Sequence, residues 1–563
     1  MARITINGKS CEFTGSPSIL AVALANGLEI PHYCWHEGLS VVASCRICLA
    51  EVWAPDPRSG QLEPIPRLLP TCQTACGDGQ IVRTDSPKAV ANQKAVMEYL
   101  LINHPLDCPI CDQAGECYLQ DYSYEYGRGE SRFEEEKIKQ PKKDVGPHIY
   151  LYSDRCIMCS RCVRFTREVT GTAELCVVGR GASQQIDLFP GLALDNELSG
   201  NVADICPVGA LLDKDFLFSQ RVWLLTRTPS IDGLTASGDN ISIEHNQGRI
   251  YRVKPRRNLA VNKWWISDEV RYGWKFIHSD ERLAEPRKLQ YGEQVGTSFS
   301  AAYDEIDERL AAARDAGAKV AALVSPMLSC EEAYLMGKWM RQACGDSAPL
   351  ILGIGPVPVS GEDKTFPPGA SPDDRNAFTI RAERAPNARG VRRVLSAVGP
   401  KPQAPSPLDF DQWLAAIKDA EVVILTGNYP SEWVTKDLTK ALSRKFIILI
   451  DTLPNDLTGK ANVLLPGATW AEKSGTFENV NGLLQTFEQA ITPIEGSRSE
   501  GQIFTDLLAR QAAATNGHGA PRFNAAAVRR EMAETLGLLE FVREVQAPAG
   551  GSFIESDMEL VEL

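Results

Sequence analysis

Apolar and polar residues alternate at the start of the chain, and this period of two predicts a small β-rich domain. The segment ARITING reads as a strand, Asn7 and Gly8 as a hairpin turn, and CEFTG as the returning strand. Apolar residues at helical spacing then predict helices within residues 16–31 and 86–103. Residues 118–145 are charged and tyrosine-rich, which predicts a solvated connector or extended arm.

The pattern changes from about residue 220 onward. Short strands punctuated by glycine continue to about residue 275. Apolar strands then alternate with helical stretches, and the strands read KVAALV, EVVILTG, FIILID and NVLLPG. This alternation predicts an α/β domain with a largely parallel sheet. Residues 355–410 have weak periodicity and predict a degenerate or flexible insertion, and the tail after residue 512 is expected to be mobile.

Composition narrows the class of protein. The chain has 563 residues, which is enough for several domains. Its net charge of −13 argues against binding to nucleic acid. No apolar run approaches the ~20 residues that span a bilayer. The start of the chain has neither a signal peptide nor a transit pattern. We therefore expect a soluble, cytosolic chain without a direct membrane span.

Cysteine usage supplies the candidate chemistry. Fourteen of the 16 cysteines precede residue 210, and Cys330 and Cys344 are isolated. In a reducing compartment such a set indicates metal or redox chemistry rather than disulfides. Eleven of these cysteines and one histidine form three sets of four with iron–sulfur spacing, which are Cys34, Cys45, Cys48 and Cys72, then His104, Cys108, Cys111 and Cys117, then Cys156, Cys159, Cys162 and Cys206.

The first set has the spacing C-x10-C-x2-C followed by a distant cysteine. A two-iron cluster on the loops of a β-grasp ferredoxin takes three cysteines from one loop and a fourth from elsewhere. The plant-type spacing has four residues in the first gap, whereas this chain has ten. The fourth ligand is open between Cys72 and Cys76. A zinc knuckle is the structural alternative, and the wide spacing argues against it.

The second set, in NHPLDCPICDQAGECYLQ, has the spacing H-x3-C-x2-C-x5-C. Four ligands within 14 residues can surround one four-iron cluster. A neutral imidazole in place of a thiolate removes one negative charge and should raise the reduction potential. The alternative for His104 is a helix-capping role beside a three-cysteine site.

The third set begins as half of a bacterial ferredoxin run, C-x2-C-x2-C-x3-C-P, whose fourth cysteine ligates the other cluster in two-cluster ferredoxins. Here Thr166 occupies that fourth position. Counting back from Cys206 gives non-ligating residues where a second run would have cysteines, namely Asn196, Ser199 and Val202. One four-iron cluster is therefore expected, which Cys206 completes, and Cys176 is expected to be a buried spare.

Together these segments resemble a known family. Residues 1–220, with SDRCIMCSRCVRF and DICPVGAL, resemble the large iron–sulfur subunit of respiratory NADH:quinone oxidoreductase (complex I), the bacterial equivalent of the mitochondrial 75 kDa subunit. The back of the chain resembles the molybdopterin-oxidoreductase-like domain of the same subunit, through SIDGLTASGDNISIEHNQGRIYRVKPR, NKWWISDEVRYGW and ANVLLPGATWAEKSGTFENVNGLLQ. The resemblance favours Cys72 as the fourth ligand of the first set, because relatives carry their single cysteine there.

The resemblance implies a multidomain α+β and α/β chain. The implied domains are a β-grasp 2Fe–2S domain (1–78), a His/Cys 4Fe–4S domain (79–145), a ferredoxin-like 4Fe–4S domain (146–220), an entry domain of the molybdopterin-oxidoreductase type (221–277) and a cofactor-free α/β domain of that type (278–563). Some bacterial relatives carry a fourth cluster in the entry region. No cysteine occurs between residues 207 and 329, and Ser267 stands where a later ligand would be. We expect that cluster, molybdenum and pterin to be absent.

The implied function is relay of single electrons in the peripheral arm of a proton-pumping NADH:quinone oxidoreductase. Electrons would come from the NADH-oxidising flavin subunit, pass one 2Fe–2S and two 4Fe–4S clusters, and leave toward quinone-side iron–sulfur subunits. No independent active site is expected in this chain. Its expected place is the bacterial cytoplasm, on the inner membrane through other subunits. The alternative is a subunit of a NAD-dependent formate dehydrogenase or of a hydrogenase.

Overall fold

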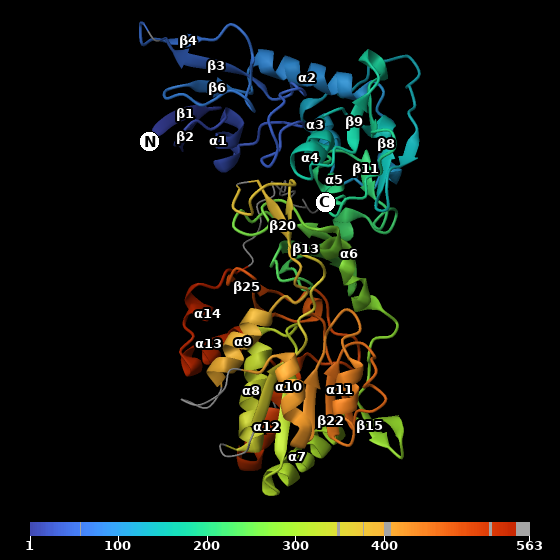
Figure 1. Cartoon of the computed structure of the whole chain (residues 1–563). Helices are drawn as coiled ribbons and strands as arrows, with labels where there is room; N and C mark the ends of the chain where they lie inside the picture. Colours follow the sequence, from blue (N-terminus) through green and yellow to red (C-terminus); the bar gives the residue numbers. More distant parts are fainter. Residues whose placement is uncertain (57, 346–349, 375, 399–406, 517–520, 548–563) are drawn as a thin grey trace. The chain divides into compact units, whose positions relative to one another are not determined.

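A computed structural model describes the chain except for residues 57, 346–349, 375, 399–406, 517–520 and 548–563 (Figure 1). The chain forms two compact units. The first unit comprises Met1–Leu225 and Thr365–Phe378, and the second comprises Thr226–Lys364 and Thr379–Leu563. Among the described residues, no helix has the length and apolar character needed to cross a membrane.

The first unit begins with a mixed sheet in the order β2-β1-β6-β3-β4, with β5 paired to β3. Asn7 and Gly8 both have positive φ, 47° and 86°, as a two-residue hairpin turn requires. The predicted hairpin and the predicted first helix are both confirmed. The elements are β1 (Ala2–Ile6), β2 (Lys9–Phe13), α1 (Ile19–Ala25), β3 (Leu49–Pro55), β4 (Leu62–Pro64), β5 (Leu69–Pro70) and β6 (Ile81–Arg83).

Two helices follow the sheet, α2 (Pro87–Leu101) and α3 (Tyr118–Tyr126). Helix α2 confirms the prediction, and the hydroxyl of Ser86 caps it by accepting a hydrogen bond from the backbone of Ala89 at 3.2 Å. Helix α3 contradicts another prediction, because its residues form a partly buried helix and not a solvated connector. Tyrosines four residues apart give α3 an apolar face, and the ring of Tyr122 packs 5.3 Å from that of Tyr33.

The rest of the first unit consists of short elements around the third ligand set. They form one sheet in the order β11-β8-β7 and one hairpin, β10-β9. The segment Thr365–Phe378 also belongs to this unit, which the sequence pattern did not predict. The elements are β7 (Lys142–Asp144), β8 (Ile149–Tyr152), α4 (Arg161–Glu168), β9 (Leu175–Val178), β10 (Gln185–Leu188), α5 (Asn201–Ile205) and β11 (Leu211–Asp213).

The second unit opens with an antiparallel sheet, β12-β13-β14, and α6 (Asp268–Tyr272). Its main sheet has the order β16-β15-β23-β22-β21-β17-β18. All neighbouring strands from β23 to β18 are parallel, as predicted, and β15 and β16 form an antiparallel edge. The strands are β12 (Thr226–Ile231), β13 (Asn240–Asn246), β14 (Arg249–Pro255), β15 (Arg287–Gln290), β16 (Glu293–Gly296), β17 (Lys319–Val324), β18 (Leu350–Ile354), β21 (Ala420–Thr426), β22 (Phe446–Asp451), β23 (Val463–Pro466), β24 (Gly475–Glu478) and β25 (Leu484–Phe487).

Helices cover both faces of this parallel sheet. Alternate residues of each strand point to opposite faces. Val320 and Val324 of β17 thus pack with α7, α8, α9 and α12, whereas Leu323 packs with α10 and α11. The helices are α7 (Phe299–Asp315), α8 (Cys330–Cys344), α9 (Ala388–Val398), α10 (Phe410–Ala416), α11 (Lys436–Ala441), α12 (Glu500–Asn516), α13 (Ala525–Leu536) and α14 (Glu540–Arg543).

Two predictions for the back of the chain are wrong in part. Residues 355–410 contain β19 (Lys364–Phe366), β20 (Phe378–Ile380) and helix α9, whose apolar face is buried. Arginine and glycine between the apolar positions had hidden that face. The tail after residue 512 contains α13 and α14, while the predicted mobile end falls largely on 548–563, outside the described residues.

Candidate iron–sulfur sites

The first ligand set lies on the loop between α1 and β3, with its distant member after β5. The thiol of Cys34 is in hydrogen-bond contact with Cys45 and Cys72, and Cys72 also contacts Cys48. These contacts, Cys45 first, hold the pKa of Cys34 well below its usual range. Two non-glycine residues of the loop, Ala43 and Arg46, have φ of 50° and 61°. Such strain is typical of backbone that wraps a ligand.

Cys76 has a different neighbour. Burial and then Cys11 raise the pKa of its thiol to about 11, and no member of the first set contributes. The structure therefore brings Cys72, and not Cys76, into contact with the thiols of Cys34 and Cys48, and Cys34 in turn contacts Cys45. This geometry supports the choice of Cys72 as the fourth ligand.

A pair of substitutions tests that choice. Cys72→Ser should abolish or strongly distort the 2Fe–2S EPR signal and lower the iron content by about two atoms per chain, because a three-thiolate site is left. Cys76→Ser is the matched control and should keep both signal and iron. If Cys76→Ser loses the signal and Cys72→Ser does not, the assignment is reversed.

The second set lines one cavity. His104, Cys108, Cys111 and Cys117 all face it, together with Arg155 and Gly209. Burial and then Arg155 lower the pKa of His104 to about 4, so its imidazole is neutral at pH 7. A neutral ring nitrogen is the form that ligates metals.

The end of α2 argues against a capping role for His104. The side chain of Lys137 donates hydrogen bonds to the carbonyl oxygens of Leu101 and Ile102, both at 2.8 Å. These are carbonyls that a helix leaves without an internal partner. With Lys137 in that place, His104 is free to face the cavity.

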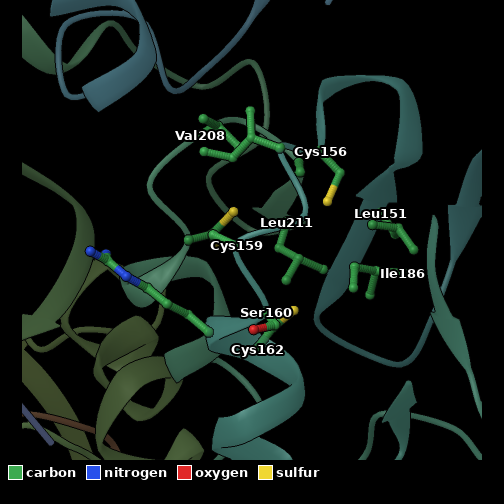
Figure 2. Close-up of a pocket in the computed structure, with 12 residues that line it drawn as sticks. Leu151, Cys156, Cys159, Ser160, Cys162, Ile186, Val208 and Leu211 are labelled. Carbon is green, nitrogen blue, oxygen red and sulfur yellow. The ribbon is translucent and has the colours of Figure 1, made fainter. Parts of the chain in front are cut away.

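The third set lines a second cavity. Figure 2 shows the sulfur atoms of Cys156, Cys159 and Cys162 turned toward the space between their segments. Cys206, directly after α5, lines the same cavity, and the remaining wall is mostly apolar. Burial raises the pKa of the Cys159 thiol to about 11, and a bound metal cation would favour its thiolate form.

Backbone conformation shapes this third loop. Met158 and Ser160 have φ of 55° and 59°, and each lies between two of the predicted ligands. Left-handed conformations are costly for such residues and persist where the surrounding structure fixes them. The alternation of these residues with the cysteines turns the sulfurs to one side.

Ordinary side chains occupy the positions where a second ferredoxin run would have its cysteines. Asn196 and Ser199 are buried, and Asn196 donates a hydrogen bond to Glu174 at 2.8 Å. Cys176 lies on β9, half-buried, and does not line the cavity of the third set. These positions fit one cluster rather than two in this domain.

No three His, Cys, Asp or Glu side chains in the described part of the chain converge closely enough to hold a single metal ion. A cluster does not require this convergence, since its ligands bind different iron atoms. The second and third sets each surround a cavity, and the thiols of the first set lie in contact with one another, so the residues present fit iron–sulfur clusters.

Direct contacts connect the second and third sets. The backbone of Tyr118, next to Cys117, donates a hydrogen bond to the carbonyl oxygen of Pro207, next to Cys206, at 3.1 Å. A Cβ on Gly209 would lie 2.3 Å from the sulfur of Cys111, so any other residue here would displace that sulfur. The segment after Cys206 is therefore seated on the second site.

Sequence reasoning missed three arginines beside the ligands, Arg155, Arg161 and Arg164. All are at most 8% exposed. A signal was present, because these residues alternate with the cysteines of an otherwise acidic chain. Arg155 ion-pairs with Asp107 at 2.9 Å, between the second and third sets.

In the second unit the predicted non-ligand positions have structural roles. Ser267 caps α6 by accepting a hydrogen bond from the backbone of Val270 at 3.3 Å. Cys330 is fully buried against Asn387, and Cys344 lies at the end of α8. Neither cysteine belongs to a ligand set.

Family models match five segments in order. They are described as a 2Fe-2S iron-sulfur cluster binding domain (1–87), the NADH-ubiquinone oxidoreductase-G iron-sulfur binding region (93–132), the ferredoxin-like domain of NADH-quinone oxidoreductase subunit 3 (146–212), an NADH-ubiquinone oxidoreductase NDSU1/NuoG-like 4Fe-4S domain (225–275) and molybdopterin oxidoreductase (401–510). The chain is homologous to the iron–sulfur G subunit of NADH-quinone oxidoreductase.

Curated relatives agree with the models. The G subunit of NADH-quinone oxidoreductase from Rickettsia bellii is 35% identical over 61% of this chain and 48% of its own length. The mitochondrial 78 kDa subunit of NADH-ubiquinone oxidoreductase from Neurospora crassa is 36% identical over 63% and 47%. The 75 kDa subunit from Reclinomonas americana is 35% identical over 65% and 51%. The chain thus spans about half the length of these relatives.

A solved NAD+-reducing [NiFe]-hydrogenase, in its H2-reduced state, is 28% identical with a TM-score of 0.33, over 39% of this chain and 91% of that chain. A similarity this low has no bearing on the fold.

The homology confirms the predicted fold class and the two kinds of cofactor, 2Fe–2S and 4Fe–4S. One match contrasts with the sequence. Residues 225–275 match a model described as a 4Fe-4S domain, yet they contain no cysteine. Absence of a cluster there stays a prediction.

Proposed function

We propose that the chain relays single electrons in the peripheral arm of a proton-pumping NADH:quinone oxidoreductase. Electrons would arrive from the NADH-oxidising flavin subunit and leave toward quinone-side iron–sulfur subunits. The observation that carries the proposal is that three ligand sets lie in one compact unit and contact one another. Iron–sulfur clusters supply one-electron chemistry, and this chain supplies their ligands and surroundings.

The proposed ligands are the twelve residues of the three sets, for one 2Fe–2S and two 4Fe–4S clusters. Contacts favour a spatial order that differs from the order in sequence. The third set contacts the first through Arg164 and the second through Gly209. The third set is therefore proposed as the middle station. The predicted boundaries near residues 78, 145, 220 and 277 remain part of the proposal.

The second unit is proposed as scaffold, without molybdenum, pterin or an active site. In open α/β sheets, ligands bind at the carboxyl ends of strands where the strand order reverses, here between β17 and β21. In this chain, hydrogen-bonded residues of the protein itself occupy the position between the carboxyl ends of β17 and β21. Thr426 accepts a hydrogen bond from the backbone of Ser325 at 2.8 Å, and Tyr429 donates one to the carbonyl oxygen of Pro356 at 2.7 Å.

The proposed location is the cytoplasmic face of a bacterial inner membrane, where other subunits would hold the chain. The test is to purify the complex from membranes of the source organism through a tag on this chain. It should contain flavin and oxidise NADH with a quinone as acceptor. A Cys159→Ser chain should give an inactive complex, and a Cys176→Ser chain should give a fully active one.

Two results would overturn the proposal. One is a complex that oxidises formate or hydrogen with NAD+ in place of quinone reduction. The other is molybdenum, tungsten or nickel in stoichiometric amount by mass spectrometry.

A further inference from the structure

Helix α4 places two arginines between the first and third ligand sets. Arg161 is 5% exposed and Arg164 is 8% exposed. Neither has an ion-pair partner among the described residues of the chain. Arg155, which is equally buried, contrasts with them because it pairs with Asp107.

Each of the two guanidinium groups spans both cluster loops. Arg164 donates hydrogen bonds to the carbonyl oxygens of Cys34 in the first set and Cys159 in the third. It also donates one to the carbonyl oxygen of Ser40. Arg161 donates to the carbonyl oxygen of Trp35, next to Cys34, at 2.6 Å. Its other amino group donates to Ile205, next to Cys206, at 3.1 Å.

Burial of two cations without an anion is costly, and carbonyl dipoles compensate only part of that cost. The Nε–H groups of Arg161 and Arg164 are buried and have no hydrogen-bond acceptor. A cluster held by four thiolates carries net negative charge, and both neighbouring sets have four cysteines. The protein thus leaves two positive charges and two free donors between two sites that become anionic when loaded.

We propose that Arg161 and Arg164 are the shared counter-charges of these two clusters and the clamp that fixes their loops against each other. A positive charge favours the more negative, reduced state, so the arginines raise both reduction potentials. The cluster of the His104 set lies outside the clamp and should not respond. This inference rests on the proposed ligand assignment.

The test is a redox titration of the reconstituted full-length chain, followed by EPR. Arg164→Gln should retain about ten iron atoms per chain but lower the midpoint potentials of the 2Fe–2S cluster and the four-cysteine cluster. The expected change is about tenfold in each reduction equilibrium, which is 59 mV for one electron. Arg161→Gln should act in the same direction, and the His104 cluster should keep its midpoint.

Two further variants separate charge from structure. Arg164→Lys keeps the charge but cannot span three carbonyl groups, so it should stay close to the wild-type midpoints. Arg167→Gln is the matched control, since Arg167 is an exposed arginine of the same helix, and it should shift nothing. If Arg164→Gln loses its clusters, Arg161→Gln and Arg164→Lys still test the effect of charge.

Unchanged midpoints in both glutamine variants at full iron content would overturn the inference, as would an equal shift of all three clusters. An equal shift in Arg164→Lys and Arg164→Gln would overturn the counter-charge role. Failure of the ligand assignment would appear differently, as low iron content or missing signals in the unaltered chain.

Discussion

Replacing Cys206 with alanine should lower the iron content from about ten to about six atoms per chain and remove one of two 4Fe–4S EPR signals. Cys206 is the proposed distant ligand of the third set and follows helix α5, whereas the other three proposed ligands lie on one loop and in the first turn of α4. Cys156, Cys159 and Cys162 remain in the variant, but the side of the cavity that Cys206 lines then offers no ligand. The 2Fe–2S signal and the signal of the His104 set should persist.

The same variant should separate the two outer clusters kinetically. Because the third set contacts both others, its loss removes the site that we propose as the intermediate between them. In a rapid-mixing experiment on the assembled complex, NADH should still reduce the 2Fe–2S cluster, while reduction of the His104 cluster should be slowed severely.

Cys176→Ala is the control, because that half-buried cysteine lies on β9 outside the cavity, and it should behave as wild type. Full iron content in Cys206→Ala would contradict the ligand assignment. Fast reduction of the His104 cluster in a chain that has lost the third cluster would contradict its middle position.

Sequence alone predicted the elements whose pattern is local. The Asn7-Gly8 hairpin, the Ser86 cap and the parallel strands β17, β21, β22 and β23 each depend on residues within a few positions. Helices α3 and α9 were missed because tyrosine and arginine residues make an apolar helix face read as polar in the linear sequence. Burial of Tyr122 against Tyr33 depends on a contact between residues 89 positions apart.

The same contrast between local and long-range features applies to the candidate sites. Ligand spacing could be predicted because it is local to each loop. The spatial order that we propose for the sets could not be predicted, because it depends on the segment from Cys206 to Gly209 contacting residues of the second set. The arginines of α4 could be seen as charges near ligands, but their bridging role follows only from carbonyl groups 124 and 130 positions away in the sequence.

A second large effect is expected in the second unit, where a buried lysine connects two buried glutamates. Lys473 lies 3.0 Å from Glu332 and 2.8 Å from Glu500, and all three side chains are at most 1% exposed. Glu332 also belongs to the capping box of α8, and Glu500 accepts a hydrogen bond from Asn428 at 2.7 Å. The group thus joins α8, α12 and the end of β21 near the carboxyl edge of the sheet.

Lys473→Met should lower the free energy of unfolding of this unit by about 3–5 kcal/mol at neutral pH, because two buried carboxylates lose their cation. Urea unfolding followed by tryptophan fluorescence measures it, since seven of the ten tryptophans lie in the second unit. Lys460→Met, at an exposed lysine of the same unit, is the control and should change the free energy by less than about 0.5 kcal/mol.

The loss of unfolding free energy in Lys473→Met should also depend on pH, because the buried carboxyl groups titrate. Burial raises the pKa of Glu500 from 4.5 to about 7 in the folded chain, although Lys473 opposes the rise. Between these values the folded chain holds a proton that the unfolded chain releases, so stability falls as pH rises through the window. Without Lys473, Glu500 keeps its proton to still higher pH. The deficit of Lys473→Met relative to wild type should therefore be smallest near about pH 5 and largest above about pH 7. A deficit that is the same at both pH values would mean that lost packing, and not an uncompensated charge, destabilises the variant.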